Sequence, residues 1–340
     1  MLPEAFLKRM QFQLGTEYTD FVESLEGERH RALRVNPLKS GGSPSETRER
    51  FLSLSPWQLE PVPWEEDGFY YVLAGYGRHP GQGEKADYAQ EGPGRHPYHE
   101  AGVYYIQEPS AMAPVTFLDV NPGERVLDLC AAPGGKSTQL AGRMQGKGLL
   151  VSNEIHPQRA RILSENVERL GIRNCLVLNE SPERLAEVFP DYFDRILVDA
   201  PCSGEGMFRK NENAGEEWSP ENVEQCAARQ DGILDCAVAM LRPGGRLVYS
   251  TCTFAPREDE GSVRRLLGRH PEMEILDPAL CLTRSGRAEA DCMAEQDCLD
   301  AWGFAPGRPD WIDEEEKFQT PDIGKTIRLW PHKLRGEGHY

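Results

Sequence analysis

Two cysteines and one aspartate follow apolar segments of the sequence in a pattern that could act on a pyrimidine ring. The segment 193–200 contains Asp199 and is followed by the Pro-Cys pair that ends in Cys202, and the segment 245–252 ends in Cys252. A thiolate that adds to carbon 6 of a pyrimidine makes carbon 5 an enamine-like nucleophile, which can attack a methyl sulfonium. A carboxyl group beside ring nitrogen 3 can donate or stabilise a proton as charge develops there. These residue types therefore predict methyl transfer to carbon 5 of a pyrimidine.

The surroundings of Cys202 and Cys252 differ from those of the other cysteines. Each closes an apolar segment and is followed by polar or glycine residues, which favours exposure at a rim. A lone cysteine is usually a small buried apolar residue, an interpretation that suits Cys130, Cys175, Cys226 and Cys236. A cysteine attacks only as a thiolate, and the candidate sources of the positive charge that favours it are Lys136, Arg209 and Lys210. The chemistry alone leaves open which of the two cysteines attacks.

A glycine turn and a carboxylate at two other segment ends indicate a site for the methyl donor. The segment 125–131 runs into Ala-Pro-Gly-Gly-Lys-Ser, where adjacent glycines let a ligand approach the backbone and the next helix opens with free N–H groups. The segment 148–154 ends in Glu154, which could accept both hydroxyls of a ribose. A P-loop needs glycine where Cys130 stands, and no GxGxxG is present. Asp128, the turn and Glu154 fit S-adenosylmethionine better than a dinucleotide. The plainer alternative is a simple turn and a solvated strand end.

Short apolar segments alternate with helical patterns over most of the chain. Strand-like segments cover 125–131, 148–154, 175–179, 193–200 and 245–252, and helical spacing of apolar residues covers 156–170 and 221–241. This alternation predicts parallel strands joined by right-handed crossovers, with helices on both faces of the sheet. We therefore expect an α/β, Rossmann-like sheet whose ligands sit beyond the carboxyl ends of the strands.

The first hundred residues have a different pattern, which predicts a smaller α+β domain. Helical spacing covers 2–14 and 17–25, residues 32–38 could form a short strand, and residues 75–102 are rich in Gly, Pro, His and Tyr. The expected division is an N-terminal RNA-binding or accessory domain with a linker over 1–100, and a catalytic domain over 101–340. Residues 281–303 are acidic and polar, which predicts an exposed insertion.

The composition limits the classes of partner. The chain has 340 residues, 39% of them apolar, and its 38 basic and 55 acidic residues give a net charge of −17. It can therefore bury a core, but it should not coat nucleic acid indiscriminately, so an RNA partner needs a local basic groove. No apolar run is long enough for a membrane span, and no set of side chains has the spacing of a metal site. The chain has nine cysteines and no CxxC pair, which favours reduced thiols. Its first residues lack the apolar core of a signal peptide, so we expect a cytoplasmic protein.

Three motifs in this order resemble the Nop/Sun family of RNA cytosine-C5 methyltransferases: DLCAAPGGKS (128–137), DAPCSGEG (199–206) and STCT (250–253). The likeness extends from RVNPLK (34–39) to PHKLRGEGH (331–339). Residues 95–112 are similar to the bacterial, RsmF-like branch, which modifies small-subunit ribosomal RNA. The resemblance implies a class I methyltransferase fold that uses S-adenosylmethionine. The implied partner is RNA, namely 16S ribosomal RNA or the small ribosomal subunit, and we expect a monomer.

The resemblance also implies roles for individual residues. Cys252 would be the nucleophile on carbon 6, Cys202 would assist release of the methylated product, and Asp199 would contact the cytosine edge. DNA cytosine-C5 methyltransferases use the cysteine of a Pro-Cys pair instead, which here would be Cys202. Asp128 and the glycine turn would hold the methionine part of the cofactor, and Glu154 the ribose. The implied cofactor contacts are Asp128, Cys130, Ala131, Ala132, Pro133, Gly134, Gly135, Lys136, Glu154, Ser181 and Asp199.

RNA contacts are expected from Arg34 and Asn36, in the family's first motif, and from Arg209 and Lys210, after the Pro-Cys loop. Such contacts would position the strand while the target base is unstacked into the pocket. Members of this branch continue past the point where this chain ends, into a last strand and often a further RNA-binding domain. The alternatives are a transfer-RNA cytosine-C5 methyltransferase and a non-catalytic RNA-binding assembly factor, although a pure binder has no need of both cysteines.

Overall fold

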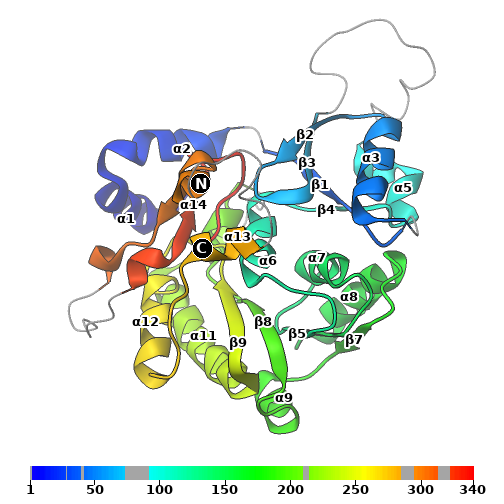
Figure 1. Ribbon diagram of the computed structural model, residues 1–340. Helices are drawn as coiled ribbons and strands as arrows, with labels where there is room; N and C mark the ends of the chain where they lie inside the picture. Colours follow the sequence, from blue (N-terminus) through cyan, green and yellow to red (C-terminus); the bar gives the residue numbers. More distant parts are fainter. Residues whose placement is uncertain are drawn as a thin grey trace, which may run out of the picture.

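A five-stranded parallel sheet lies at the centre of the computed structural model, which describes residues 2–27, 29–39, 42–72, 92–209, 214–284, 295–312 and 322–340. In sheet order the strands are β7 (Cys175–Leu178), β6 (Leu149–Asn153), β5 (Arg125–Asp128), β8 (Phe193–Asp199) and β9 (Leu241–Ser250). The chain runs from β5 to one edge and then returns to the other edge through β8 and β9 (Figure 1). The order therefore reverses between β5 and β8, the point at which such sheets bind ligands.

Helices cover both faces of this sheet because successive strand residues face opposite ways. Val126 packs with α6 (Ala113–Leu118), α7 (Gly135–Met144) and α8 (Pro157–Arg169) in one buried cluster. Leu127 packs with α9 (Pro182–Val188), α11 (Pro220–Met240) and α12 (Glu260–Arg269) in another. The predicted α/β, Rossmann-like fold is confirmed, and each of its expected strand segments overlaps an observed strand. Among the described residues, no helix is both long and apolar enough to cross a membrane.

The N-terminal part forms a smaller antiparallel sheet in the order β2-β3-β1-β4. Its elements are β1 (Ala32–Val35), α3 (Pro44–Leu54), β2 (Gln58–Val62), β3 (Glu65–Val72), α5 (Pro97–Glu100) and β4 (Tyr104–Ile106). Helix α3 begins at a capping box, because Ser43 accepts a hydrogen bond from the Glu46 N–H and the Glu46 side chain accepts one from the Ser43 N–H. Strand β4 lies past residue 100, so this sheet extends beyond the expected boundary.

The first two helices pack against the half of the molecule that carries the parallel sheet (Figure 1). α1 (Glu4–Leu14) and α2 (Tyr18–Glu26) bury Phe6, Met10 and Phe21 in one cluster with Trp218 and Phe254. Trp218 follows the short helix α10 (Ala214–Glu217), and Phe254 follows β9 in the chain. Residues from the beginning and from the last third of the chain therefore share one core.

The segment expected to be an exposed insertion contributes to the core. α13 (Pro278–Arg284) and α14 (Glu295–Ala301) precede β10 (Phe304–Pro306), which pairs with β11 (Ile327–Leu329). Leu282, Cys298 and Leu299 are buried in one cluster with Trp64. These three residues of the segment are therefore buried rather than exposed, while residues 285–294 lie outside the described part of the chain. Cys298 is disulfide-bonded, so the expectation of uniformly reduced thiols is also wrong.

Candidate active site

The structure brings Cys202 and Cys252 together. Their Sγ atoms are 3.3 Å apart, although the two residues are separated by 50 positions in the chain. They follow the C-terminal ends of β8 and β9, where Asp199 pairs with Ser250 in parallel register. The Gly206 N–H donates a hydrogen bond to the Cys252 carbonyl at 2.8 Å, which joins the two loops that carry the cysteines. At this separation the two sulfur atoms can exchange a proton directly.

Asp199, at the end of β8, is held as a carboxylate. Its Oδ2 accepts a hydrogen bond from Lys136 Nζ at 2.7 Å, and its Oδ1 accepts one from Ser250 Oγ at 2.8 Å. Burial alone would raise the pKa of Asp199, but the adjacent charge of Lys136 and the neighbouring His339 together outweigh it and hold the pKa well below its usual range. Asp199 therefore accepts hydrogen bonds. An ionised carboxylate cannot donate a proton to ring nitrogen 3, which the sequence allowed for this residue, so another group must be that donor.

The Cys202 thiol is held in its protonated form. Its hydrogen bond with Cys252, its burial and the negative charge of Glu258 raise the pKa of Cys202 well above its usual range. Lys136, one of the expected sources of positive charge, is already paired with Asp199. Cys202 is thus suited to donate a proton or a hydrogen bond to its neighbour, and poorly suited to attack as a thiolate.

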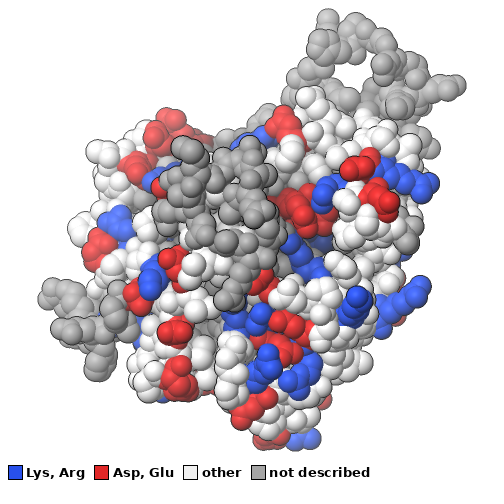
Figure 2. Space-filling model, in the orientation of Figure 1, with Lys and Arg blue, Asp and Glu red and all other residues white. Residues whose placement is uncertain are grey.

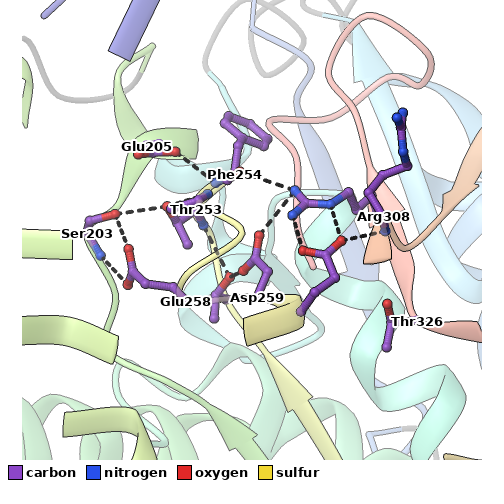
Figure 3. A network of polar contacts seen from close by, with 12 residues as sticks. Ser203, Glu205, Thr253, Phe254, Glu258, Asp259, Arg308 and Thr326 are labelled. Carbon is purple, nitrogen blue, oxygen red and sulfur yellow. Dashed lines mark hydrogen bonds and ion pairs between the residues drawn. The ribbon is translucent and has the colours of Figure 1, made fainter. Parts of the chain in front are cut away.

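A buried polar network connects the residues that follow the two cysteines (Figure 3). Ser203, next to Cys202, donates hydrogen bonds to both carboxylate oxygens of Glu258, with an N–Oε2 distance of 2.9 Å. The Ser203 hydroxyl also lies 2.9 Å from Oγ1 of Thr253, the residue after Cys252. Glu258 is fully buried, so this network replaces the hydration that the carboxylate loses. A carboxylate outside the three sequence motifs is therefore part of the network that joins the two loops carrying the cysteines.

Replacing Glu258 by glutamine is expected to change how stability depends on pH. Burial raises the pKa of Glu258 from 4.5 to about 7. Between these values the folded protein keeps a proton that the unfolded chain has lost, so the free energy of unfolding falls as pH rises. The glutamine stays neutral, and its amide oxygen can still accept from the Ser203 N–H and from Gln230, which donates to Glu258 at 2.9 Å. Between about pH 5.5 and 8, the free energy of unfolding measured with urea should fall by about 2 kcal/mol more in the wild type than in the variant. If the two proteins differ in unfolding free energy by the same amount at both pH values, the raised pKa of Glu258 is contradicted.

The backbone of the glycine turn is fixed before α7 begins. Three of its carbonyl oxygens accept side-chain hydrogen bonds: Ala132 from Arg159 (2.8 Å), Pro133 from Asn166 (2.8 Å) and Gly135 from Arg34 (3.0 Å). Gly134 has φ 112°, a backbone conformation that strains any other residue, and a Cβ at this position would also lie 3.1 Å from Leu163 Cδ1. A turn held this firmly can present its backbone to a ligand without reorganising.

Three carboxylates gather at the ends of neighbouring strands. Asp128 ends β5, Glu154 follows β6 and Asp199 ends β8. Burial, with the negative charges of Asp199 and Glu154, raises the pKa of Asp128 to about 7 in spite of a 2.6 Å hydrogen bond from Ser137. Asp128 Oδ1 is buried without a hydrogen-bond partner among the described residues. This concentration of negative charge suits a positively charged ligand, and the adjacent turn suits one that binds through the backbone.

The remaining expected cofactor residues border this region. Glu154 is 3% exposed, and its Oε1 accepts a hydrogen bond from the His156 N–H at 3.0 Å, which fixes the carboxylate. Ser181 caps α9, where its hydroxyl accepts from the Arg184 N–H at 3.3 Å. Burial raises the pKa of the Cys130 thiol, which stays neutral beneath the turn. Glu154 is therefore the one of these three that can hold a ribose by charge-assisted hydrogen bonds.

The structure does not gather the expected RNA contacts on one exposed surface. Arg34 and Asn36 are each 2% exposed, and their side chains hydrogen-bond to both parts of the chain. We therefore correct the expectation for these two residues: their polar groups are satisfied inside the contact between the two sheets. The Arg209 side chain is 5% exposed and its Nε is 3.6 Å from Glu337, whereas Lys210 lies outside the described residues. Among the described residues on the face in Figure 2, basic and acidic side chains are interspersed.

Sequence reasoning missed two buried residues, Glu205 and His339. Glu205 is fully buried and accepts hydrogen bonds from Arg9 of α1 (2.6 Å), from Trp218 (2.9 Å) and from the Phe254 N–H (3.0 Å). These bonds connect α1 to the loops after both cysteines. The sequence signal for Glu205 was a carboxylate between two glycines, shortly after the Pro-Cys pair.

The described part of the chain holds no group of three or more His, Cys, Asp or Glu arranged for a metal ion.

Comparison with family models gives two matches that together cover most of the chain. Residues 115–340 match 16S rRNA methyltransferase RsmB/F, and residues 2–109 match the N-terminal domain of 16S rRNA methyltransferase RsmF. Ribosomal RNA small subunit methyltransferase F of Klebsiella pneumoniae is 41% identical over 336 residues, which are 97% of this chain and 65% of that protein. The protein of the same name from Cronobacter sakazakii is 39% identical over 283 residues, or 81% of this chain and 55% of that protein.

Solved structures share the fold. A methyltransferase homologue from Pyrococcus horikoshii has a TM-score of 0.67 at 26% identity and covers 99% of this chain and 97% of its own. NSun6 from Pyrococcus horikoshii with SFG has a TM-score of 0.70 at 21% identity and covers 99% of this chain and 96% of its own. The chain spans just under two thirds of the length of the first curated relative, and about half that of the second. On the match over residues 115–340, the chain belongs to the RsmB/F family of 16S rRNA methyltransferases.

Proposed function

We propose that this chain transfers a methyl group from S-adenosylmethionine to carbon 5 of a cytosine in RNA, with small-subunit ribosomal RNA as the substrate. The observation that carries the proposal is the 3.3 Å separation of Cys202 Sγ and Cys252 Sγ, at two strand ends that also hold Asp199. A protein that only binds RNA has no use for two adjacent thiols beside an ionised carboxylate. Membership of the RsmB/F family supports ribosomal RNA as the substrate class.

Cys252 is the nucleophile of the proposed reaction. Its thiolate forms a bond to carbon 6 of the cytosine, and the electron pair of the 5,6 double bond becomes available at carbon 5. When bound, S-adenosylmethionine supplies a methyl group on a positively charged sulfur. After transfer, a solvent water molecule takes the carbon 5 proton, and the electron pair of that bond restores the double bond and expels the Cys252 sulfur as a thiolate. The protonated Cys202 lies 3.3 Å away and donates a hydrogen bond to that departing sulfur.

Asp199 and Lys136 are proposed to recognise the edge of the base. An ionised Asp199 accepts a hydrogen bond from the exocyclic amine of cytosine, and Lys136 donates to ring nitrogen 3 or to the adjacent carbonyl, where negative charge develops. The 2.7 Å ion pair between them keeps the donor and the acceptor next to each other. Uracil presents a carbonyl where cytosine has its amine, so it would face the Asp199 carboxylate without a hydrogen to share.

The cofactor would bind beside the glycine turn. Asp128 and Asp199 supply the negative charge that attracts a ligand carrying a sulfonium and an ammonium group, and Glu154 is placed to accept the ribose hydroxyls.

Two measurements test the proposed function. The purified chain should transfer tritiated methyl from S-adenosylmethionine to ribosomal RNA or to small subunits. Bisulfite sequencing of RNA from cells that lack the protein should show specific small-subunit cytosines losing their resistance to conversion. Loss of resistance confined to transfer RNA would reject the substrate, and absence of any methyl transfer would reject the enzyme activity.

A further inference from the structure

The last residues of the chain place a histidine against the Lys136–Asp199 pair. His339 is 7% exposed, and its Nε2 lies 3.3 Å from Lys136 Nζ and 3.5 Å from Asp199 Oδ1. The His339 backbone exchanges hydrogen bonds of 3.1 and 2.8 Å with Leu329 of β11. The next residue exchanges two more, of 3.0 and 3.1 Å, with Thr251, which precedes Cys252. Two strands therefore fix the position from which this imidazole reaches the site.

The hydrogen bonds of the ring indicate where its proton lies. Nδ1 is 2.8 Å from the Gly338 carbonyl, which can only accept, so Nδ1 is the donor. Lys136 Nζ can only donate, so Nε2 must accept. A neutral imidazole with its proton on Nδ1 satisfies both contacts. An imidazolium would place a second cation beside Lys136, and the 3.5 Å separation from Asp199 Oδ1 is too long for the short bond that such a charged donor makes.

We propose that His339 is a positioning residue of the methyl-transfer site, which holds the Lys136 ammonium group against Asp199 by accepting one of its hydrogens. An ammonium group has three donors. One is used on Asp199 at 2.7 Å and one on His339, so the third keeps a defined direction. With only one acceptor, the flexible lysine side chain would rotate about its remaining hydrogen bond. The inference rests on the proposed function, because that defined direction matters only if Lys136 meets the base.

Two substitutions separate the acceptor from the bulk of the side chain. His339→Leu keeps a similar volume but removes the acceptor, and it should lower kcat for RNA methylation about 10- to 100-fold, the effect of losing one hydrogen bond to a charged group. KM for S-adenosylmethionine should change less than about threefold, because Asp128, the glycine turn and Glu154 are untouched. His339→Gln can place an amide oxygen near the position of Nε2 and should recover kcat to within about threefold of the wild type. His270→Leu, which alters a histidine paired with Asp235 outside the site, is the control and should retain wild-type kcat.

A second measurement does not depend on activity. A long-range proton–nitrogen NMR correlation of the 340-residue chain should show His339 with its proton on Nδ1 and a bare Nε2. In protein labelled with nitrogen-15 lysine, the signal of the Lys136 ammonium group should shift in His339→Leu and stay near its wild-type position in His339→Gln. Equal kcat in the wild type and His339→Leu would overturn the inference, as would a proton on Nε2. If the wild type itself transfers no methyl group, the proposed function fails, while the NMR result still decides where the His339 proton lies.

Discussion

Replacing Cys252 by alanine is expected to abolish methyl transfer, with a loss of about 10⁴-fold or more, the scale seen when a covalent nucleophile is removed. Carbon 5 of cytosine does not attack a methyl sulfonium until carbon 6 carries a nucleophile, and the neighbouring Cys202 cannot take over. Burial and the negative charge of Glu258, which the substitution leaves in place, raise the pKa of Cys202, so it remains a thiol. Initial rates of tritiated methyl incorporation into RNA, at saturating cofactor, measure the effect.

Cys236 provides the matched control for this substitution. It is a partly buried cysteine of α11, packed at the edge of a core cluster far from the strand ends that carry the site. Like Cys252→Ala, Cys236→Ala removes a sulfur atom from a partly buried position, and this variant should keep most of the activity. Full activity in Cys252→Ala, with binding of the cofactor unchanged, would show that Cys252 does not attack.

Replacing Cys202 by alanine should slow turnover by about 100-fold or more and leave enzyme covalently attached to RNA. Once the methyl group is in place, the bond between carbon 6 and Cys252 must break, and the sulfur leaves as a thiolate. The Cys202 thiol, 3.3 Å away, stabilises that thiolate by donating a hydrogen bond, and the alanine cannot. A denaturing gel of the variant incubated with RNA and cofactor should show a slowly migrating band that nuclease treatment removes.

The double variant, with both cysteines replaced by alanine, identifies the source of this band. It should form no adduct, because the attacking sulfur is missing as well. Cys202→Ala with normal turnover and no adduct would contradict the release role. An adduct that persists in the double variant would show that a third nucleophile attacks the base.

The placement of Asp199, Cys202 and Cys252 at neighbouring strand ends could be predicted from the sequence because it follows from local patterns. Apolar segments that end in Asp199 and Cys252 identify two parallel strands, and parallel strands bring their carboxyl ends to one edge of a sheet. The neighbouring positions of β8 and β9 then place both thiols side by side. The glycine turn between β5 and α7 could also be predicted, because two adjacent glycines between a strand and a helix favour a turn.

The contacts that support the site could not be predicted, since each joins segments far apart in the chain. Arg34 looked like an RNA contact, but it crosses 101 positions to bind the Gly135 carbonyl. Glu258 reaches back 55 positions to Ser203, and His339 reaches 203 positions to Lys136. A charged residue in a sequence carries no mark of its partner, so surface exposure was the natural expectation. The burial of Leu282, Cys298 and Leu299 was missed for the same reason, because it depends on contact with Trp64, far away in the chain.

The assignment of the two cysteines is tested most directly by locating the covalent bond to RNA in the wild-type protein. In RNA that contains 5-fluorocytidine, the carbon 5 proton is replaced by fluorine, which cannot leave as a proton does, so the adduct accumulates with both thiols present. After nuclease and protease digestion, mass spectrometry should find the methylated nucleotide on the peptide that contains Cys252. Attachment to the peptide that contains Cys202 would reverse the assigned roles and contradict the account.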